Sequence, residues 1–375
     1  MTNYTAINTK VRAMKGSLVL TPEEIDDRLA GYTLSDLYQV LDQLPSYHQV
    51  MPSEQNKLDL TAENLIELID RGLRYDFLKL YRFSGFEQRA ALSVYGIRFE
   101  REFITKVLRG LERQESVPFV VNPFTDYLEK HRHFHIGELI TKTSVLDAID
   151  TFRDTDYGKF FEDYHDYFHD HDYNHYIIST VFEQYCAVLV WKKASRVLND
   201  KALTRFKKLF GREMDLANIR TIFRLKFYYK VDENFIRSQL FSPGRYLNEA
   251  NISALLASQD KNSFFNLLTN LGYQDLFKSG ENKVVGLKQQ KAWLKTIEHR
   301  FAKSLPQSVL PLFDYLSLKE LEADLLKEKV EAIAYQSPVT MSFYNWKEFL
   351  GWLQRWVWST YLVHEMISTG WLTNT

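Results

Sequence analysis

The histidines between residues 163 and 176 have the spacing in this chain that most resembles a metal site. His165 and His169 are four residues apart, and so are His171 and His175. Residues four apart lie on the same face of a helix, and helices present two imidazole groups to zinc or iron in this way. Residues 165–175 therefore contain one candidate metal site.

Two His-Asp doublets, 169–170 and 171–172, also resemble the core of the all-α, metal-dependent phosphohydrolases of the HD superfamily. An HD-like phosphohydrolase that uses the His165–His175 cluster is therefore the alternative function. Against it, the histidine pairs are offset by six residues, about 600° of helical rotation, so they lie on different faces of one helix. Glu-x-x-His motifs on partner helices, which di-iron bundles need, are absent. A solvent-exposed or interfacial acidic segment is the favoured interpretation, and a pH-sensing role is a third.

Other enzyme signatures are missing from the sequence. His131, His133 and His135 alternate, but Lys130 and Arg132 lie between them, which indicates a basic, exposed loop. There is no glycine-rich phosphate loop and no Gly-x-Ser-x-Gly elbow. The single cysteine, Cys186, lies among apolar residues and is predicted to be a buried thiol. Outside the histidine cluster the sequence therefore has no catalytic signature, and we predict no catalytic residue, no metal and no cofactor.

The composition favours a helical protein. Hydrophobic residues make up 45% of the 375 residues, which is ample for a packed core, and only 15 glycines and 9 prolines interrupt the chain. A net charge of −1 gives no general attraction to nucleic acid. No apolar run reaches the ~18–20 residues of a membrane span, and the N-terminus has no signal-peptide pattern. These features predict a soluble, cytoplasmic protein.

Helix start signals recur along the chain without any convincing strand alternation, so the predicted fold class is all-α. Thr21-Pro22, Thr61 and Ser317 are typical N-terminal caps, and Ser242-Pro243-Gly244 is predicted to turn the chain. The predicted helical segments are 4–20, 61–110, 138–200, 215–240, 247–259, 263–271, 287–305, 317–335 and 343–370.

One block of sequence recurs with its landmarks in the same order. Residues 100–109 (EREFITKVLR) align with residues 215–224 (DLANIRTIFR), so that Glu100 matches Asp215 and Arg109 matches Arg224. A leucine-rich or otherwise apolar stretch ending near a tyrosine follows both blocks and also occurs near the N-terminus; the tyrosines are Tyr157, Tyr273 and Tyr47. Repeated units that cannot bury their apolar faces alone must pack on one another. The pattern predicts three similar helical lobes.

Two further groups of side chains indicate contacts between helices or with a partner. Arg12, Arg109, Arg220 and Arg224 recur near the repeated helix starts, and we expect them to bind carboxylates such as Glu183 or Asp215 on neighbouring helices; direct contact with a partner is the alternative. Nine aromatic residues crowd the tail after residue 342, including five of the chain's seven tryptophans. Core packing, or contact with a partner or membrane surface, would explain this tail.

Taken in order, several motifs resemble the C subunit of V-type (archaeal and bacterial) ATPases, which is called the d subunit in eukaryotes. The resemblance spans residues 4 to about 335 and rests on Tyr4-x-x-Ile7-x-x-x-Val11-Arg12-Ala13-Met14-Lys15-x-x-Leu18, Asp154-Thr155-Asp156-Tyr157-Gly158, Asp215-x-x-Asn218-Ile219-Arg220-x-Ile222-x-Arg224-x-Lys226, Ser242-Pro243-Gly244 and Tyr315-x-x-x-Lys319-Glu320-x-Glu322. The chain departs from the family pattern at Leu325-Leu326-Lys327 and at Ala187, and the tail beyond Pro338 has no counterpart.

This resemblance implies a non-catalytic subunit of the central stalk. Such a subunit is a single funnel-like domain of three helical lobes, here at roughly 4–95, 96–210 and 211–335, followed by the tryptophan-rich helix 343–370. It would link the rotor-ring proteolipid subunits to the central-shaft subunits and transmit torque for ion transport. It would be cytoplasmic and peripherally associated with the membrane through the membrane sector, without nucleic acid or a small-molecule substrate as partner.

Overall fold

The structure is a computed structural model that describes residues 4–16, 18, 29, 31–52, 60–113, 122–169, 175–276 and 287–335. Every regular element in these ranges is a helix, which confirms the predicted all-α class. The α-helices are α1 (Thr5–Lys15), α3 (Leu34–Gln43), α4 (Pro45–His48), α5 (Ala62–Phe83), α6 (Phe86–Glu112), α7 (Pro123–Arg132), α8 (Ile136–Leu139), α9 (Val145–Ile149), α10 (Gly158–Asp163), α11 (His165–His169), α12 (His175–Val197), α13 (Asp200–Arg224), α14 (Glu233–Ser238), α15 (Glu249–Ala257), α16 (Lys261–Asn270), α17 (Leu287–Ser304) and α18 (Leu310–Tyr335). Short 3-10 helices lie at Asp150–Phe152 and Gln274–Leu276, and a π-helical turn at Leu225–Tyr229.

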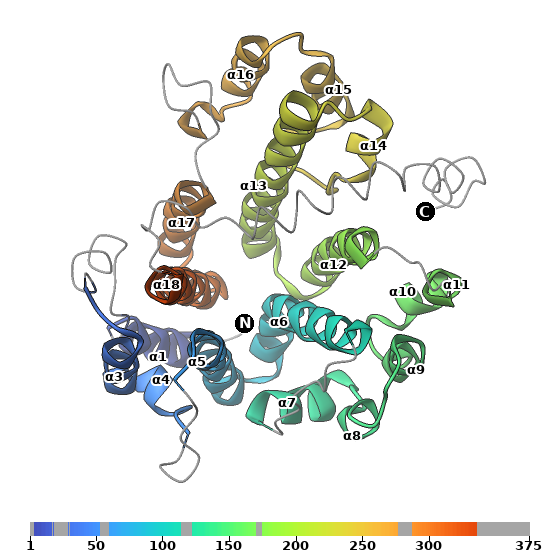
Figure 1. The fold of residues 1–375 in the computed structure, drawn as a ribbon. Helices are drawn as coiled ribbons and strands as arrows, with labels where there is room; N and C mark the ends of the chain where they lie inside the picture. Colours follow the sequence, from blue (N-terminus) through green and yellow to red (C-terminus); the bar gives the residue numbers. More distant parts are fainter. Residues whose placement is uncertain are drawn as a thin grey trace.

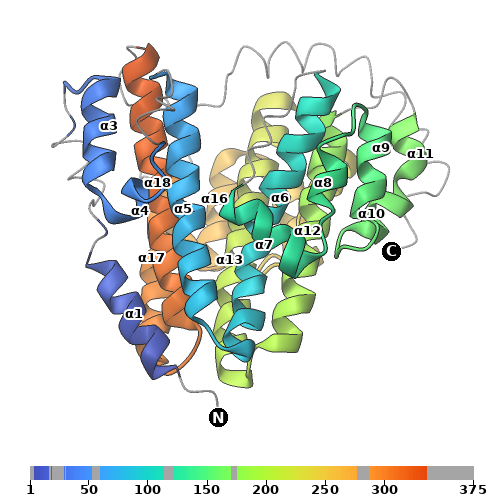
Figure 2. The same cartoon turned by 90° about the horizontal axis from the view of Figure 1, so that it is seen from below.

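The long helices α5, α6, α12, α13, α17 and α18 form a closed ring. Each packs on the next in the order α5, α18, α17, α13, α12, α6, and α6 packs on α5 again (Figure 1). Along the chain they form three hairpins, α5–α6, α12–α13 and α17–α18, whose turns lie at the same end of the molecule (Figure 2). The second helix of each hairpin is α6, α13 or α18.

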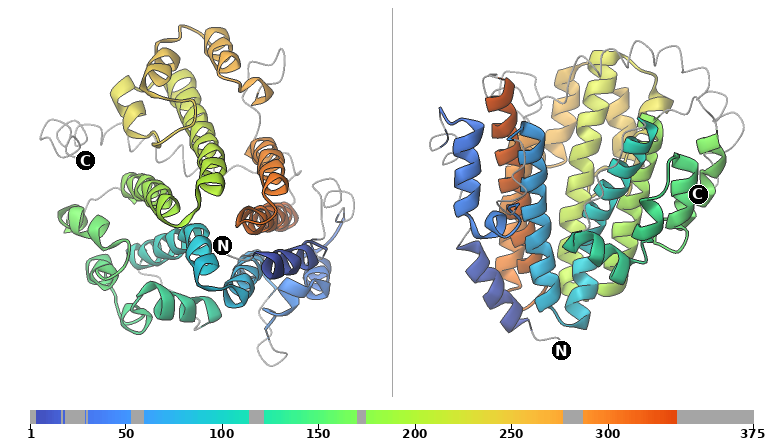
Figure 3. Two further views of the ribbon diagram at one scale, coloured as in Figure 1. Left: turned by 180° about the vertical axis from the view of Figure 1, so that it is seen from behind. Right: turned by 60° about the horizontal axis from the view of Figure 1, so that its bottom comes forward.

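The shorter helices lie outside the ring in three groups. Helices α1, α3 and α4 lie beside α5 and α18. Helix α7 packs on α5 and α9 packs on α6, with α8, α10 and α11 next to them, and α14 to α16 lie on the side of α13 (Figures 1 and 3). The N-terminal helices α1 and α3 therefore pack against α18, which lies at the other end of the described chain. Lys15 on α1 makes an ion pair with the buried Asp314 on α18. The division into lobes at 4–95, 96–210 and 211–335 remains a prediction, and its inner boundaries fall within α6 and α13.

Local signals explain where most helices begin. The side chain of Thr61 accepts a hydrogen bond of 3.2 Å from the amide of Asn64, which confirms the predicted start of α5. The start predicted at Ser317 is wrong, because α18 already begins at Leu310 and Ser317 lies inside it. Pro311 suits the first helical turn, where its missing amide hydrogen costs nothing. The predicted starts at 21–22 and the helix 343–370 lie outside the described residues.

The other segments agree in part with the sequence prediction. The predicted pairs 247–259 and 263–271 correspond to α15 and α16, and 287–305 corresponds to α17. Residues 138–200 are not one continuous helix but several short helices before α12. Cys186 is buried in α12, as predicted. No helix in the described part of the chain is long and apolar enough to cross a membrane.

Buried apolar side chains form two clusters in the described residues. The larger cluster joins the described helices from α1 to α12, the first half of α13, the end of α17, and α18. The smaller one lies between the second half of α13 and helices α14 to α16, around Phe223, Phe264 and Leu268. The third outer group therefore packs on an apolar core of its own.

Candidate functional site

The ring of long helices surrounds a small cavity. Its volume is about 90 Å³, which corresponds to about three water molecules at ~30 Å³ each. Five of the ring helices line it, and the aromatic part of the lining comes from Tyr95, Phe206, Phe210, Phe301 and Phe313. An α-helix with its side chains is about 10–12 Å across. The cavity itself is therefore too small to hold a helix.

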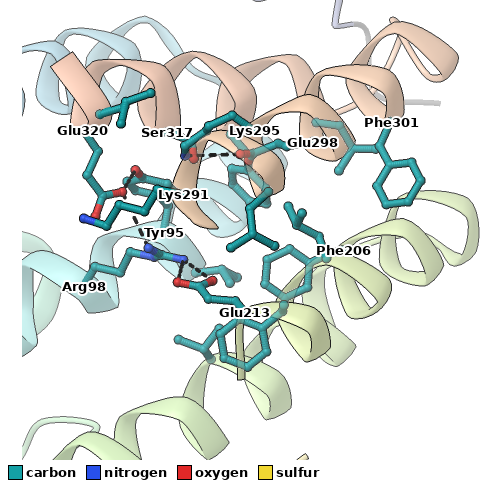
Figure 4. A pocket seen from close by; sticks show the side chains of 18 of the residues that line it. Tyr95, Arg98, Phe206, Glu213, Lys291, Lys295, Glu298, Phe301, Ser317 and Glu320 are labelled. Carbon is teal, nitrogen blue, oxygen red and sulfur yellow. Dashed lines mark hydrogen bonds and ion pairs between the residues drawn. The ribbon is translucent and has the colours of Figure 1, made fainter. Parts of the chain in front are cut away.

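Charged side chains from three hairpins meet beside this cavity (Figure 4). Nη2 of Arg98 on α6 donates to both carboxylate oxygens of Glu213 on α13, at 3.0 and 2.7 Å. Nη1 of Arg98 lies 3.5 Å from Oε2 of Glu320 on α18. The same oxygen of Glu320 accepts a hydrogen bond of 2.8 Å from the hydroxyl group of Tyr95. One guanidinium group thus contacts two carboxylates that belong to two other helices.

The surrounding charges keep this cluster ionised. Burial alone would raise the pKa of Glu320, but Arg98, Lys295 and Lys291 outweigh burial and lower that pKa to about 2. Burial also acts to lower the pKa of Arg98, yet Glu213 and Glu320 raise it overall. Glu320 therefore remains a carboxylate throughout the physiological pH range.

A second kind of site lies on the outer side of each hairpin's second helix, and the clearest case is Glu100 on α6. Its side chain is fully buried and accepts a hydrogen bond of 2.8 Å from the hydroxyl group of Tyr157. Nε and Nη2 of Arg132 donate to its two oxygens at 2.7 and 3.1 Å. Arg132 also pairs with Asp156, whose other partner is Lys193 at 2.9 Å. The charge of Glu100 is thus balanced by a bidentate arginine.

Asp215 on α13 has the same tyrosine contact, but its other donors belong to the backbone. The hydroxyl group of Tyr273 donates to Asp215 at 2.5 Å. The backbone amides of Arg245, Tyr246 and Leu247 donate to the same carboxylate at 3.0, 2.7 and 3.3 Å. The turn at 242–244 brings these amides to α13, and a Cβ atom at Gly244 would lie 2.2 Å from Oδ1 of Asp215.

Glu322 on α18 forms the third such pair. Its Oε1 accepts a hydrogen bond of 2.9 Å from the hydroxyl group of Tyr47 and pairs with Lys319, whose ammonium group lies 4.0 Å from the centre of the Tyr47 ring. All three residues are buried. The tyrosines predicted from the recurring block therefore each bind a carboxylate on the second helix of a hairpin. Glu100 and Asp215 are the two aligned acids of that block.

These carboxylates are bound by donors within the core, so their arrangement is that of structural acceptors rather than general bases. Burial raises the pKa of the Cys186 thiol, which disfavours the reactive thiolate. Among the described residues, no group of three or more His, Cys, Asp or Glu side chains could hold a metal ion.

The predicted histidine cluster is only partly described. His165 and His169 share one side of α11, with ring centres 4.7 Å apart, as their spacing predicted. His171 lies outside the described residues, and α12 begins at His175. Nδ1 of His165 lies 3.7 Å from Asp166. Nothing in the described part of this segment supports the HD-like phosphohydrolase.

The segment 131–135 differs from the exposed basic loop that its sequence predicted. The three histidines are exposed, but His131 belongs to the last turn of α7 and lies 5.3 Å from the ring of Tyr81. His133 ends this helix in a left-handed conformation, with φ 58°. The prediction was wrong for Arg132, whose side chain points inward to Glu100 and is only 13% exposed.

The predicted arginine contacts also need correction. Arg220 donates to Gln290 rather than to a carboxylate, and Glu183 pairs with Arg101 at 2.6 Å. The arginines that do bind buried or central carboxylates, Arg98 and Arg132, were missed. Arg98 and Glu213 stand just before the recurring block, each two residues ahead of the aligned acid, and extending the alignment by two residues is the signal that could have revealed them.

Exposed apolar side chains gather at the turn of the first hairpin. Phe83 ends α5 and is 52% exposed, while Phe86 begins α6 and is 88% exposed. Tyr228, in the π-helical turn after α13, is 56% exposed. Large apolar groups exposed side by side are typical of contact surfaces.

The fold and these sites define an all-α scaffold whose polar groups connect its own helices. The chain belongs to the ATP synthase (C/AC39) subunit family, whose sequence profile matches residues 7–341. It is 25% identical over 332 residues to the C subunit of the A-type ATP synthase of Methanococcoides burtonii, covering 87% of this chain and 88% of that protein. It is 30% identical over 131 residues to the C subunit of the A-type ATP synthase of Archaeoglobus fulgidus, covering 34% of this chain and 37% of that protein.

Proposed function

We propose that this chain is a non-catalytic central-stalk subunit of a V-type rotary ATPase. It acts as a socket that links the central shaft to the rotor ring of the membrane sector and transmits torque for ion transport. The observation that carries this proposal is the closed ring of long helices, whose members are joined across the axis by Arg98, Glu213 and Glu320. Membership of the ATP synthase subunit family supports the same assignment.

A socket that transmits torque must resist twisting, and the construction of this ring supplies that property. Neighbouring ring helices pack through buried apolar side chains, and protein interiors have the density and low compressibility of organic crystals. Contacts far apart in the chain close the ring. One is the hydrogen bond of 2.6 Å from the hydroxyl group of Tyr315 on α18 to Asp76 on α5. Rotation applied at one end of the ring would therefore reach the other end with little deformation.

Copurification tests the proposal. The tagged full-length chain is recovered from its native membranes in a mild detergent, and its partners are identified by mass spectrometry. We expect the rotor-ring proteolipid together with shaft and catalytic-head subunits of a rotary ATPase. Recovery of the chain without any of these subunits would contradict the proposal, because a central-stalk subunit must contact both the ring and the shaft.

The exposed phenylalanines offer a sharper version of this experiment. We expect the double variant Phe83→Ser plus Phe86→Ser to lose one class of partner, because it removes the exposed apolar contact at the hairpin turn. Tyr228→Ser is the matched control, since Tyr228 is also exposed but lies at the other end of α13 from the α12–α13 turn. Loss of the proteolipid alone would assign the hairpin end to the ring, and loss of the shaft alone would assign it to the shaft. If the double phenylalanine variant and Tyr228→Ser both recover the full set of partner subunits, the phenylalanine pair is not a contact.

A further inference from the structure

Arg98, Glu213 and Glu320 occupy matching places on the second helices of the three hairpins. Each stands two residues before the carboxylate that binds a buried tyrosine on the outer side of the same helix. Successive residues of an α-helix are rotated by about 100°, so residues two apart point in roughly opposite directions. When the tyrosine-bound carboxylate points outward, the residue two positions earlier must therefore point toward the axis of the ring.

We propose that these three residues are equivalent positions of a threefold internal repeat and form an axial clamp, with Arg98 as the residue that positions the three hairpins. The clamp consists of one guanidinium group and two carboxylates, one group from each hairpin. Figure 4 shows the side chains of Arg98, Glu213 and Glu320 converging from three different helices. The proposal goes beyond the function of a socket, because it assigns to Arg98 the positioning of the three hairpins relative to one another.

The composition of the clamp explains why one position carries an arginine and the other two carry glutamates. The planar guanidinium group has five N–H donors and can bind two carboxylates at once. Three carboxylates at these positions would repel one another, and three arginines would as well. With one arginine and two glutamates, each of the three side chains has a partner of opposite charge on another hairpin. Lys291 and Lys295 on α17 lie beside the cluster and offset its excess negative charge.

Of the other polar groups beside the clamp, the hydroxyl group of Tyr95 also joins α6 to α18 through Glu320. Glu298 accepts from Ser317, Lys291 pairs with Asp324, and all four of these residues lie on the α17–α18 hairpin. Arg98 instead joins α6 to α13 and to α18. Loss of Arg98 therefore removes the connection to Glu213 on α13, which neither Tyr95 nor these pairs replace.

The clamp also limits where a partner can be seated. The clamp lies beside a cavity of about 90 Å³, which is too small to hold a helix, so a helix inserted along the axis would have to end at the clamp. If the chain is the socket proposed above, the clamp forms the floor of that socket. This consequence rests on the proposed function, whereas the clamp itself is a property of the isolated chain.

The test uses the purified full-length chain and compares Arg98→Glu with a matched control, Arg101→Glu. Arg98 and Glu213 are 35% and 33% exposed, and Arg101 and Glu183 are 38% and 46% exposed, but the second pair joins α6 to α12, which already pack extensively. We expect Arg98→Glu to accelerate amide hydrogen exchange in α13 and α18 about tenfold or more, equal to at least about 1.4 kcal/mol at 25 °C. We expect Arg101→Glu to change it less than threefold.

A charge permutation then separates the clamp from an ordinary ion pair. Arg98→Glu combined with Glu213→Arg moves the arginine from α6 to α13 and keeps one cation with two carboxylates. If the positions are equivalent, the double variant should recover most of the protection against exchange that Arg98→Glu loses. Failure of this recovery, or equal effects of Arg98→Glu and Arg101→Glu, would overturn the proposal. Should Arg98→Glu fail to fold, Arg98→Gln and Glu320→Gln provide the same comparison with smaller changes. Because partners are not involved, this result is independent of the copurification that tests the proposed function.

Discussion

Glu100 and Asp215 are both fully buried carboxylates that accept a hydrogen bond from a tyrosine, yet the structure balances their charges in different ways. Glu100 is paired with the guanidinium group of Arg132. Asp215 is held by three backbone amides that follow the turn at Gly244. A buried carboxylate needs donors rather than a particular partner. The two arrangements differ in what a mutation leaves behind. Loss of Arg132 leaves Glu100 as a buried charge without its arginine, whereas loss of Asp215 leaves backbone amides without an acceptor.

We expect the largest effect from Arg132→Ala. This change leaves the fully buried Glu100 with its charge unpaired, and breaking a buried ion pair from one side costs about 3–5 kcal/mol. Arg153→Ala is the control, because Arg153 and its partner Asp150 are exposed, and its effect should stay within about 0.5 kcal/mol. The free energy of unfolding is measured in urea. A decrease in the free energy of unfolding of less than about 1 kcal/mol for Arg132→Ala would show that Arg132 is not needed to stabilise the buried charge of Glu100.

Replacing both Glu100 and Arg132 should lower the free energy of unfolding less than replacing Arg132 alone. Glu100→Met together with Arg132→Met replaces the charged pair by apolar groups of similar length, and such replacements are often close to neutral. We therefore expect the double variant to be more stable than Arg132→Ala alone, although Tyr157 still loses its acceptor. The same urea titration decides this, and a double variant less stable than Arg132→Ala would contradict it.

Asp215→Ala is expected to have the next largest effect. It leaves no buried charge, but it removes the acceptor of three amides and of the Tyr273 hydroxyl group, so we expect a loss of about 2–4 kcal/mol. Asp232→Ala serves as control, since Asp232 caps α14 at the surface and should cost about 1 kcal/mol. Thermal and urea unfolding of both variants provide the measurement. An equal effect of the two changes would mean that the amides near Gly244 find other acceptors.

Gly244→Ala should destabilise the protein by a smaller amount, about 1–3 kcal/mol, because its Cβ atom would lie 2.2 Å from Oδ1 of Asp215. Gly137→Ala is the matched control, because a Cβ atom there meets no other atom within 4 Å. The clash also predicts non-additivity in combination with Asp215→Ala, which removes the obstructing oxygen. Additive free energies of unfolding in this pair would contradict the close approach.

The sequence predicted much of this organisation, and the reasons for its failures are physical. The alignment of Glu100 with Asp215, each followed by a tyrosine, depends only on the order of residues along the chain. Both acids do bind their tyrosines. The partner of Glu100 was missed because Arg132 was assigned to an exposed loop, whereas α7 continues through it. The donors of Asp215 are backbone amides, which have no side-chain signature in a sequence. The contact between Arg98 and Glu320 joins helices far apart in the chain, so no local pattern reveals it.

The smallest expected effect concerns alkaline pH. Burial, together with the nearby Glu100, holds the pKa of Tyr157 well above its ordinary value of 10, so the folded protein keeps this phenol protonated where the unfolded chain would release the proton. The folded-state pKa is raised, so this contribution to stability is fully present below pH 10 and is lost as the pH rises toward the folded value. Ultraviolet titration of the tyrosines should separate an early, reversible phase from a later phase that coincides with unfolding. Tyr157→Phe should leave the early phase unchanged and reduce the amplitude of the later phase. A reduced early phase would instead mean that the hydroxyl group of Tyr157 is accessible and is not held by Glu100.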